Sequence, residues 1–169
     1  MVTFIGEVSK LSDKRINLSN SKLKNTVLIS LFTAIIAACS LITFPFPVPF
    51  TLQTLGIFSA LLILGGKNGT IATAVYIAIG LVGIPVFSGF SAGIGHLMGA
   101  TGGYVIGFLL TAICYWLITA IFGNKTVVKL CGLLSGLILC YTAGVIWYTA
   151  VYLRDTSLSA VTSALTIGV

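Results

Sequence analysis

The sequence predicts an all-α integral membrane protein, built as a compact bundle of apolar helices. Of its 169 residues, 57% are hydrophobic and only 7% are charged, and the mean hydropathy is +1.14. A soluble domain has roughly a quarter of its residues charged. One core cannot enclose so many apolar side chains, so lipid must cover the rest. We attribute the pI of about 9.3 to lysines that flank membrane helices, and expect no nucleic-acid partner.

The chain divides into a polar tail, residues 1–25, and a transmembrane domain, residues 26–169. The tail is lysine-rich and precedes the first apolar run, so we do not expect a cleaved signal peptide. Five transmembrane segments are expected, the second too short to cross a hydrocarbon core of roughly 30 Å. They cover residues 26–44, 52–64, 70–86, 104–122 and 127–153. A short separate helix is expected over residues 157–169.

Prolines and glycines mark the breaks between these segments. Pro45, Pro47 and Pro49 end the first one, because alternating prolines remove backbone donors and favour extended chain. Residues 65–69 are predicted to form a tight turn between the second and third segments, and residues 123–125 another between the fourth and fifth.

Basic residues are expected to lie on one side of the membrane. If the segments alternate in direction, eight basic residues share a side, namely Lys10, Lys14, Arg15, Lys22, Lys24, Lys67, Lys125 and Lys129. Only Arg154 falls on the other side. The positive-inside rule then predicts a multi-pass protein of the cytoplasmic membrane with its N-terminus in the cytoplasm.

Two uncharged loops on the outer side, residues 44–51 and 87–103, have two possible interpretations. They are either plain connectors or the walls of a small-molecule pocket, where glycines let the backbone approach a ligand closely. Gln53 favours the pocket, because a primary amide inside an apolar helix is costly unless hydrogen-bonded. The candidate ligand-binding residues are Thr51, Gln53, Phe87, Ser91, Thr101, Gly102, Gly103 and Tyr104.

The sequence argues against an enzyme, a cofactor and a metal site. His96 is the only histidine, and the four cysteines lie in apolar stretches where a thiol packs as a small hydrophobe. There is no phosphate loop and no arrangement of nucleophile and base. No charged residue lies in the interior of a predicted membrane segment, where ion-coupled transporters usually keep one at mid-membrane. A transporter of this kind must use the energy of a partner or act passively.

A partner subunit needs a docking surface, and three stripes of small residues are candidates. Small residues let helix backbones approach closely in lipid. The stripes are Ala34 and Ala38; Gly103, Gly107 and Thr111; and Gly132, Gly136, Cys140 and Gly144. For the last two stripes we favour packing inside the bundle. The first stripe is compatible with either internal packing or docking.

Three blocks of this sequence resemble the BioY family. They read VPFTLQTLG at residues 48–56, GLVGIPVF at 80–87 and GATGGY at 99–104, and the match extends from about Leu31 to Val169. BioY proteins are biotin-binding S-components of bacterial energy-coupling-factor (ECF) transporters. The resemblance implies a six-helix S-component that captures biotin from outside. Its expected partners are a transmembrane coupling subunit, two ABC-type ATPases and the lipid bilayer.

The resemblance also implies roles for individual residues. It assigns Ala34 and Ala38 to contact with the coupling subunit, and Thr51 to Gln53 and the loop before Tyr104 to covering the ligand. The family usually has proline in place of Ala100. It also continues past the equivalent of Val169 into a Gly-Asp and a Lys that contribute to binding, so we expect this sequence to lack its last helix. The alternatives are an S-component for another vitamin, a passive channel or a structural membrane subunit.

Overall fold

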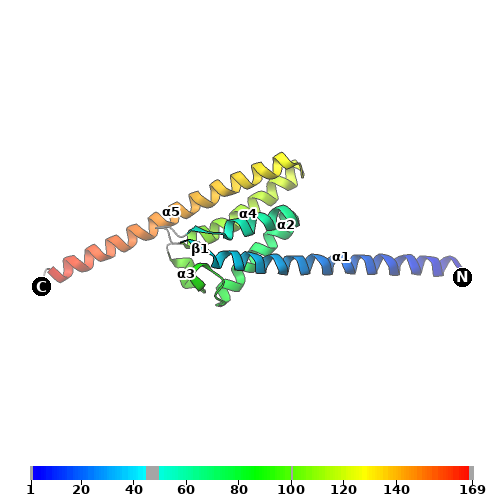
Figure 1. Ribbon diagram of the computed structural model, residues 1–169, viewed down its shortest axis with the longest axis horizontal. Coiled ribbons are helices and arrows are strands. Elements are labelled where there is room, and N and C mark those ends of the chain that lie inside the picture. Colours follow the sequence, from blue (N-terminus) through cyan, green and yellow to red (C-terminus); the bar gives the residue numbers. More distant parts are fainter. Residues whose placement is uncertain (1, 45–49, 100, 168–169) are drawn as a thin grey trace.

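The computed structural model describes residues 2–44, 50–99 and 101–167, with side chains described over 21–42, 51–99 and 101–151. The described chain is almost entirely helical, which confirms the all-α prediction (Figure 1). Its elements are α1 (Val2–Leu41), β1 (Thr43–Phe44), β2 (Phe50–Thr51), α2 (Gln53–Val82), the 3-10 turn η1 (Ser88–Phe90), α3 (Ile94–Met98), α4 (Gly102–Phe122) and α5 (Thr126–Ile167).

Four of the described helices contain a stretch that is long and apolar enough to cross a membrane. These stretches are Ser21–Leu41, Gln53–Val82, Gly102–Phe122 and Thr126–Val151. Helix α1 begins at Val2, so the helix continues through the predicted polar tail. The three prolines predicted to end the first segment lie outside the described residues.

Helix α2 reverses direction at Gly65, which supplies the turn predicted between the second and third segments. Gly65 has a φ of 81° and a ψ of 169°, a conformation that favours glycine. Residues on either side of it then pack together: a Cβ on Gly69 would lie 2.8 Å from the Cα of Leu61. The turn is tighter than predicted, because Gly65 alone leaves the helical conformation and Gly66 to Gly69 are helical.

Helix α5 differs from the prediction because it runs without a break to Ile167. A separate short helix over residues 157–169 was expected, but residues 157–167 continue α5. The physical reason is the lack of any glycine or proline between Thr149 and Ile167, which leaves nothing to end the helix. Residues 168 and 169 lie outside the described chain.

The helices pack in the order α1, α2, α4, α5, and threonine hydroxyls link each neighbouring pair. The hydroxyl of Thr33 donates to Ala72 O at 3.2 Å, that of Thr70 to Ala112 O at 2.9 Å, and that of Thr111 to Gly136 O at 2.7 Å. Such bonds satisfy a hydroxyl and a carbonyl where water is absent.

The glycine stripes of α4 and α5 face each other, which confirms that they pack inside the bundle. A Cβ on Gly107 would lie 2.9 Å from the Cα of Cys140, and one on Gly136 would lie 2.7 Å from the Cγ2 of Thr111. The stripe on α1 behaves differently, since Ala34 and Ala38 are both exposed on the surface of the bundle.

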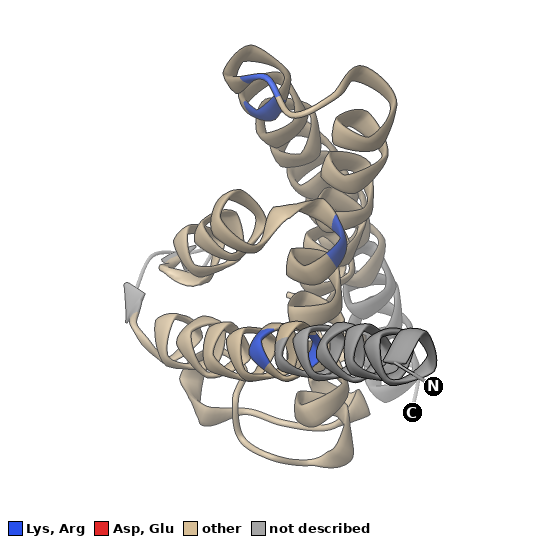
Figure 2. Ribbon diagram, turned by 90° about the vertical axis from the view of Figure 1, so that its right-hand side faces the viewer, with Lys and Arg blue, Asp and Glu red and all other residues tan. Residues whose placement is uncertain are grey.

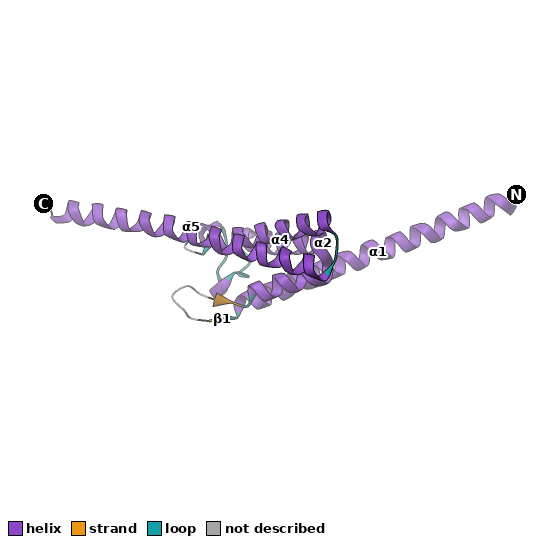
Figure 3. Cartoon of the chain, turned by 90° about the horizontal axis from the view of Figure 1, so that it is seen from above, coloured by secondary structure: helices purple, strands orange, loops and turns teal. Residues whose placement is uncertain are grey.

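The two ends of the bundle differ in charge. The turns at Gly65 and Gly123 and the Ser21 end of the apolar part of α1 lie at one end, and β1 and α3 lie at the other (Figures 1 and 3). Every charged residue whose side chain is described belongs to the first end, namely Lys22, Lys24, Lys67, Lys125 and Lys129. Figure 2 looks along the bundle from this end, with lysine and arginine in blue. Among residues 21–42, 51–99 and 101–151, whose side chains are described, none at the end with β1 and α3 is charged.

Candidate ligand-binding site

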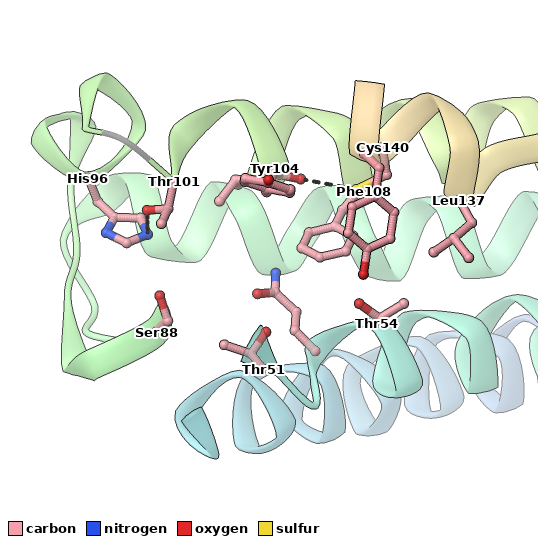
Figure 4. A pocket seen from close by; sticks show the side chains of 12 residues that line it. Thr51, Thr54, Ser88, His96, Thr101, Tyr104, Phe108, Leu137 and Cys140 are labelled. Atoms are coloured by element: carbon pink, nitrogen blue, oxygen red, sulfur yellow. Dashed lines mark hydrogen bonds between the residues drawn. The ribbon is translucent and has the colours of Figure 1, made fainter. Parts of the chain in front are cut away.

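A cavity of about 210 Å³ lies at the uncharged end of the bundle, between the start of α2 and the helices α4 and α5 (Figure 4). Its wall combines hydroxyl, amide, imidazole and aromatic groups with an apolar part. The lining residues are Thr51, Gln53, Thr54, Ser88, His96, Thr101, Tyr104, Val105, Phe108, Leu137, Cys140 and Tyr141. Small-molecule sites usually consist of an apolar pocket with a few polar groups in its wall.

The short strands place the first polar residues of the wall. Thr51 pairs with Thr43 and Phe50 with Phe44 in an antiparallel ladder, and the Leu52 N–H donates to Ile42 O at 3.2 Å. The chain is therefore held against the end of α1 where α2 begins. As a result, Thr51, Gln53 and Thr54 all contribute to the cavity wall.

The Gln53 side chain is buried, with 4% of its surface exposed, yet part of its amide has no partner. Its Nε2 atom has no hydrogen bond to any described group. More than nine in ten buried polar groups in proteins are hydrogen-bonded, and an unpaired one costs about 1–3 kcal/mol. The cavity wall therefore contains a donor suited to a ligand oxygen.

The loop between α2 and α4 closes one end of the cavity. Ser40 and Tyr76 both donate hydroxyl hydrogen bonds to Val86 O, and the Gly93 N–H donates to Gly80 O at 2.8 Å. The ring of Phe87 packs directly on Gly80, where an added Cβ would lie 2.2 Å from its Cζ. These contacts hold the loop firmly on α1 and α2.

His96 extends from α3 into the cavity wall and stacks on Phe87, with ring centroids 5.0 Å apart and an interplanar angle of 15°. Its Nδ1 lies 2.8 Å from Ser91 Oγ. Its Nε2 lies 3.4 Å from Thr101 Oγ1 (Figure 4). Burial lowers the pKa of the imidazole below its usual value, so it is neutral at neutral pH.

Helices α4 and α5 form the opposite wall. The Tyr104 and Tyr141 rings meet edge to face, with centroids 6.2 Å apart, and the Cys140 thiol donates to Tyr104 O at 3.7 Å. Val105, Phe108 and Leu137 add apolar surface. This wall offers aromatic and aliphatic contact to a ligand.

The structure brings the predicted site residues together in different roles. Thr51, Gln53, Thr101 and Tyr104 line the cavity, whereas Phe87 and Ser91 lie behind the wall and support His96. Gly102 and Gly103 lie where the neighbouring groups leave no room for a side chain. A Cβ on Gly102 would lie 1.7 Å from Leu97 O, and one on Gly103 would lie 2.3 Å from the Cβ of Trp147.

Sequence reasoning did not select several lining residues, namely Thr54, His96, Val105, Phe108, Leu137, Cys140 and Tyr141. For two groups of lining residues, helical spacing in the sequence indicates that the side chains lie on one face of a helix. Tyr104, Val105 and Phe108 share one face of α4, and Leu137, Cys140 and Tyr141 share one face of α5. The sequence does not reveal that these two faces meet the start of α2. Within the described residues, no three His, Cys, Asp or Glu side chains cluster as metal ligands.

Comparison with known proteins agrees with this architecture. The model of the BioY family matches residues 12–169. The chain belongs to the BioY family. This confirms the resemblance noted in the sequence. A biotin transporter BioY from Thermotoga maritima is 43% identical over 91 residues, which are 53% of this chain and 54% of that protein. The chain thus spans about half the length of this relative.

Another relative and a solved structure match over longer segments. A probable biotin transporter BioY from Pyrococcus horikoshii is 37% identical over 127 residues, covering 75% of each chain. A crystal structure of the S-component for biotin from an ECF-type ABC transporter is also similar, with a TM-score of 0.69 and 32% identity over 77% of this chain and 74% of that one. BioY relatives are transporters, which confirms that the chain is not an enzyme.

Proposed function

We propose that this protein captures biotin at the outer face of a bacterial cytoplasmic membrane, as the substrate-specific component of an ECF-type transporter. The observation that carries this proposal is the cavity at the uncharged end of the bundle, with the unpaired amide of Gln53 in its wall. Family membership supports the choice of ligand, because the named relatives are biotin transporters.

The chemistry of biotin suits this cavity. Its fused rings and aliphatic chain would contact Tyr104, Phe108 and Leu137, and its ureido and carboxylate oxygens are acceptors for the free N–H of Gln53. The polar atoms of Thr51, Ser88 and Thr101 lie in the same wall. Biotin is here the cargo, not a cofactor.

The expected partners are a transmembrane coupling subunit and two ABC-type ATPases. We infer that these ATPases supply the energy for uptake, because residues 1–169 contain no phosphate-binding loop. Ala34 and Ala38 are exposed on α1, beside the exposed side chains of Leu31 and Ile35. This small-residue stripe in an apolar surface is suited to close contact with another membrane helix.

The charges of the chain support one orientation in the membrane. We infer that the end with Lys67, Lys125 and Lys129 faces the cytoplasm, because basic residues are retained on that side. The cavity then opens at the outer face, and the N-terminus is cytoplasmic.

Biotin binding to the purified full-length chain tests the proposal. The Trp147 indole donates to Gly99 O at 3.0 Å, close to the cavity wall at Thr101, so its fluorescence should report binding. Trp116 is 39% exposed and does not line the cavity, and Trp116→Phe leaves Trp147 as the sole reporter. We expect a saturable fluorescence change with biotin that Trp147→Phe removes. A saturable response to a different vitamin, with none to biotin, would contradict the proposal.

A further inference from the structure

His96 is unusual among the groups around the cavity because protonation gives it a positive charge near neutral pH. All described lysines lie at the opposite end of the bundle, and the described lining residues include no carboxylate and no other basic side chain. The titratable groups that face the cavity or Phe87 are Tyr76 from α2, Tyr104 from α4, and Cys140 and Tyr141 from α5. Tyrosine and cysteine are neutral at pH 7.

The hydrogen bonds around His96 determine which ring nitrogen is free to take up a proton. The Ser91 hydroxyl donates its only hydrogen to Ser88 O at 2.6 Å. Its Oγ can therefore only accept from His96, so Nδ1 carries the hydrogen at 2.8 Å. The other nitrogen, Nε2, then has a lone pair, and the Thr101 Oγ1 atom lies 3.4 Å from it, which is long for a hydrogen bond.

These contacts keep the imidazole ring in place while the protonation state of Nε2 changes. The ring is stacked on Phe87, whose side chain is 1% exposed and fixed on Gly80. Protonation at Nε2 leaves the bond from Nδ1 to Ser91 intact. The Thr101 hydroxyl can rotate away from Nε2, so the new N–H is free to donate to a ligand oxygen.

A carboxylate in this cavity needs a positive partner. An ionised carboxylate moved from water to an apolar site without a partner is strongly disfavoured. Biotin ends in a carboxylate, so this step rests on the proposed function. Gln53 supplies a neutral donor, and His96 is the one described residue of the wall whose side chain can become a cation near neutral pH.

We propose that His96 receives the carboxylate of the ligand and takes up one proton from solvent at Nε2 when the ligand binds. The neutral imidazole becomes an imidazolium, and the ion pair forms within the cavity wall. The Gln53 amide is then left for the ureido oxygen. His96 thereby selects ligands that carry an acid group at this end.

The proposal fixes the direction of the pH dependence. In the free protein burial lowers the pKa of His96, so the ring is neutral at pH 7. A carboxylate within about 4–6 Å raises that pKa by roughly one to three units. Binding therefore takes up protons at any pH between the free and the bound pKa. Affinity should rise about tenfold per unit of that difference as the pH falls through this interval, and then level off.

Calorimetry measures the proton uptake directly. Biotin is titrated into the full-length chain in lipid nanodiscs at pH 7.0, in phosphate and in Tris, whose protonation enthalpies differ. We expect the binding heat to depend on the buffer with the sign of proton uptake. His96→Gln keeps a neutral N–H donor and should bind more weakly with no buffer dependence. The primary amide of biotin, tested on the unmodified chain, should also bind without proton uptake.

Each result decides the matter. Equal biotin heats in the two buffers, proton uptake that persists in His96→Gln, or uptake with the amide would each overturn the role of His96 while leaving biotin binding established. The comparison of biotin with its amide needs no variant, so it holds even if His96→Gln fails to fold. Absence of any biotin binding would overturn the proposed function and this inference together.

Discussion

The amide of Gln53 links the apolar start of α2 to the chemistry of the cavity. Gln53 is buried and its Nε2 atom is unpaired, so a hydrogen bond from Nε2 to a ligand oxygen would remove the cost of burying this donor. In Gln53→Leu the helix keeps a side chain of similar size, but the donor is lost. Loss of one buried hydrogen bond costs about 1–3 kcal/mol, or roughly a tenfold to hundredfold weakening. Titration of the Trp147 fluorescence with biotin measures the change.

A matched control lies two turns further along α2. Ser59 donates to Leu55 O at 2.8 Å within its own helix and does not line the cavity. Ser59→Ala should therefore bind biotin as the unmodified chain does. If Gln53→Leu also keeps full affinity, its amide does not contact the ligand.

The sequence could identify single residues where their chemistry was out of place. Gln53 stands out as an amide in an apolar helix, and the structure places it in the cavity wall. Gly102 and Gly103 show the limit of such reasoning. Glycine permits close approach by any group, and here that group is the Leu97 carbonyl or the Trp147 side chain. His96 could not be assigned either, because its partners Ser91, Thr101 and Phe87 meet it only after the loop folds.

At the scale of elements, apolar length and helix breakers predicted most of the helices. Gly65 and Gly123 both adopt positive φ angles at the predicted turns. The continuous helix α5 was missed because a polar composition after Leu153 suggested an end where no residue breaks the helix. For α1 the sequence did not decide which way the stripe of small residues faces. Spacing alone does not distinguish contact with a partner subunit from contact with a neighbouring helix of the same chain.

The exposed stripe on α1 gives a prediction about transport. Ala34→Trp should abolish biotin uptake in cells that also express the coupling subunit and the ATPases, yet leave biotin binding to the purified chain unchanged. A large side chain separates backbones that alanine allows into contact. Ala34 is exposed on α1 and does not line the cavity. Uptake of labelled biotin and fluorescence titration provide the two measurements.

The control for this variant is Ala120→Trp, which places the same side chain at an exposed alanine of α4. Uptake should persist in this variant, so a general effect of tryptophan on insertion or expression would be recognised. Loss of binding together with uptake in Ala34→Trp would indicate that the residue supports the bundle itself. Full uptake would indicate that Ala34 faces lipid.

At the scale of the whole molecule, the cavity depends on contacts between distant segments. The first arm of α2 brings Gln53, and the loop after its second arm brings His96. Helices α4 and α5 bring Tyr104 and Cys140. The sequence favoured the two uncharged loops as walls because of the amide of Gln53, and the loop over residues 87–103 also contains many glycines. It did not predict the contribution of α5, which reaches the cavity only through its close glycine packing on α4.

The charge difference between the two ends predicts how the molecule lies in the membrane. In a variant without native cysteines, Met98→Cys places a thiol at a 72% exposed position of α3, and Asn124→Cys places one at the exposed turn beside Lys125. In intact cells a membrane-impermeant maleimide should label Met98→Cys only, because lysine-bearing turns are retained in the cytoplasm. After lysis both variants should be labelled, which shows that each thiol is reactive. Labelling of Asn124→Cys alone in intact cells would place the cavity on the cytoplasmic side and contradict capture from outside.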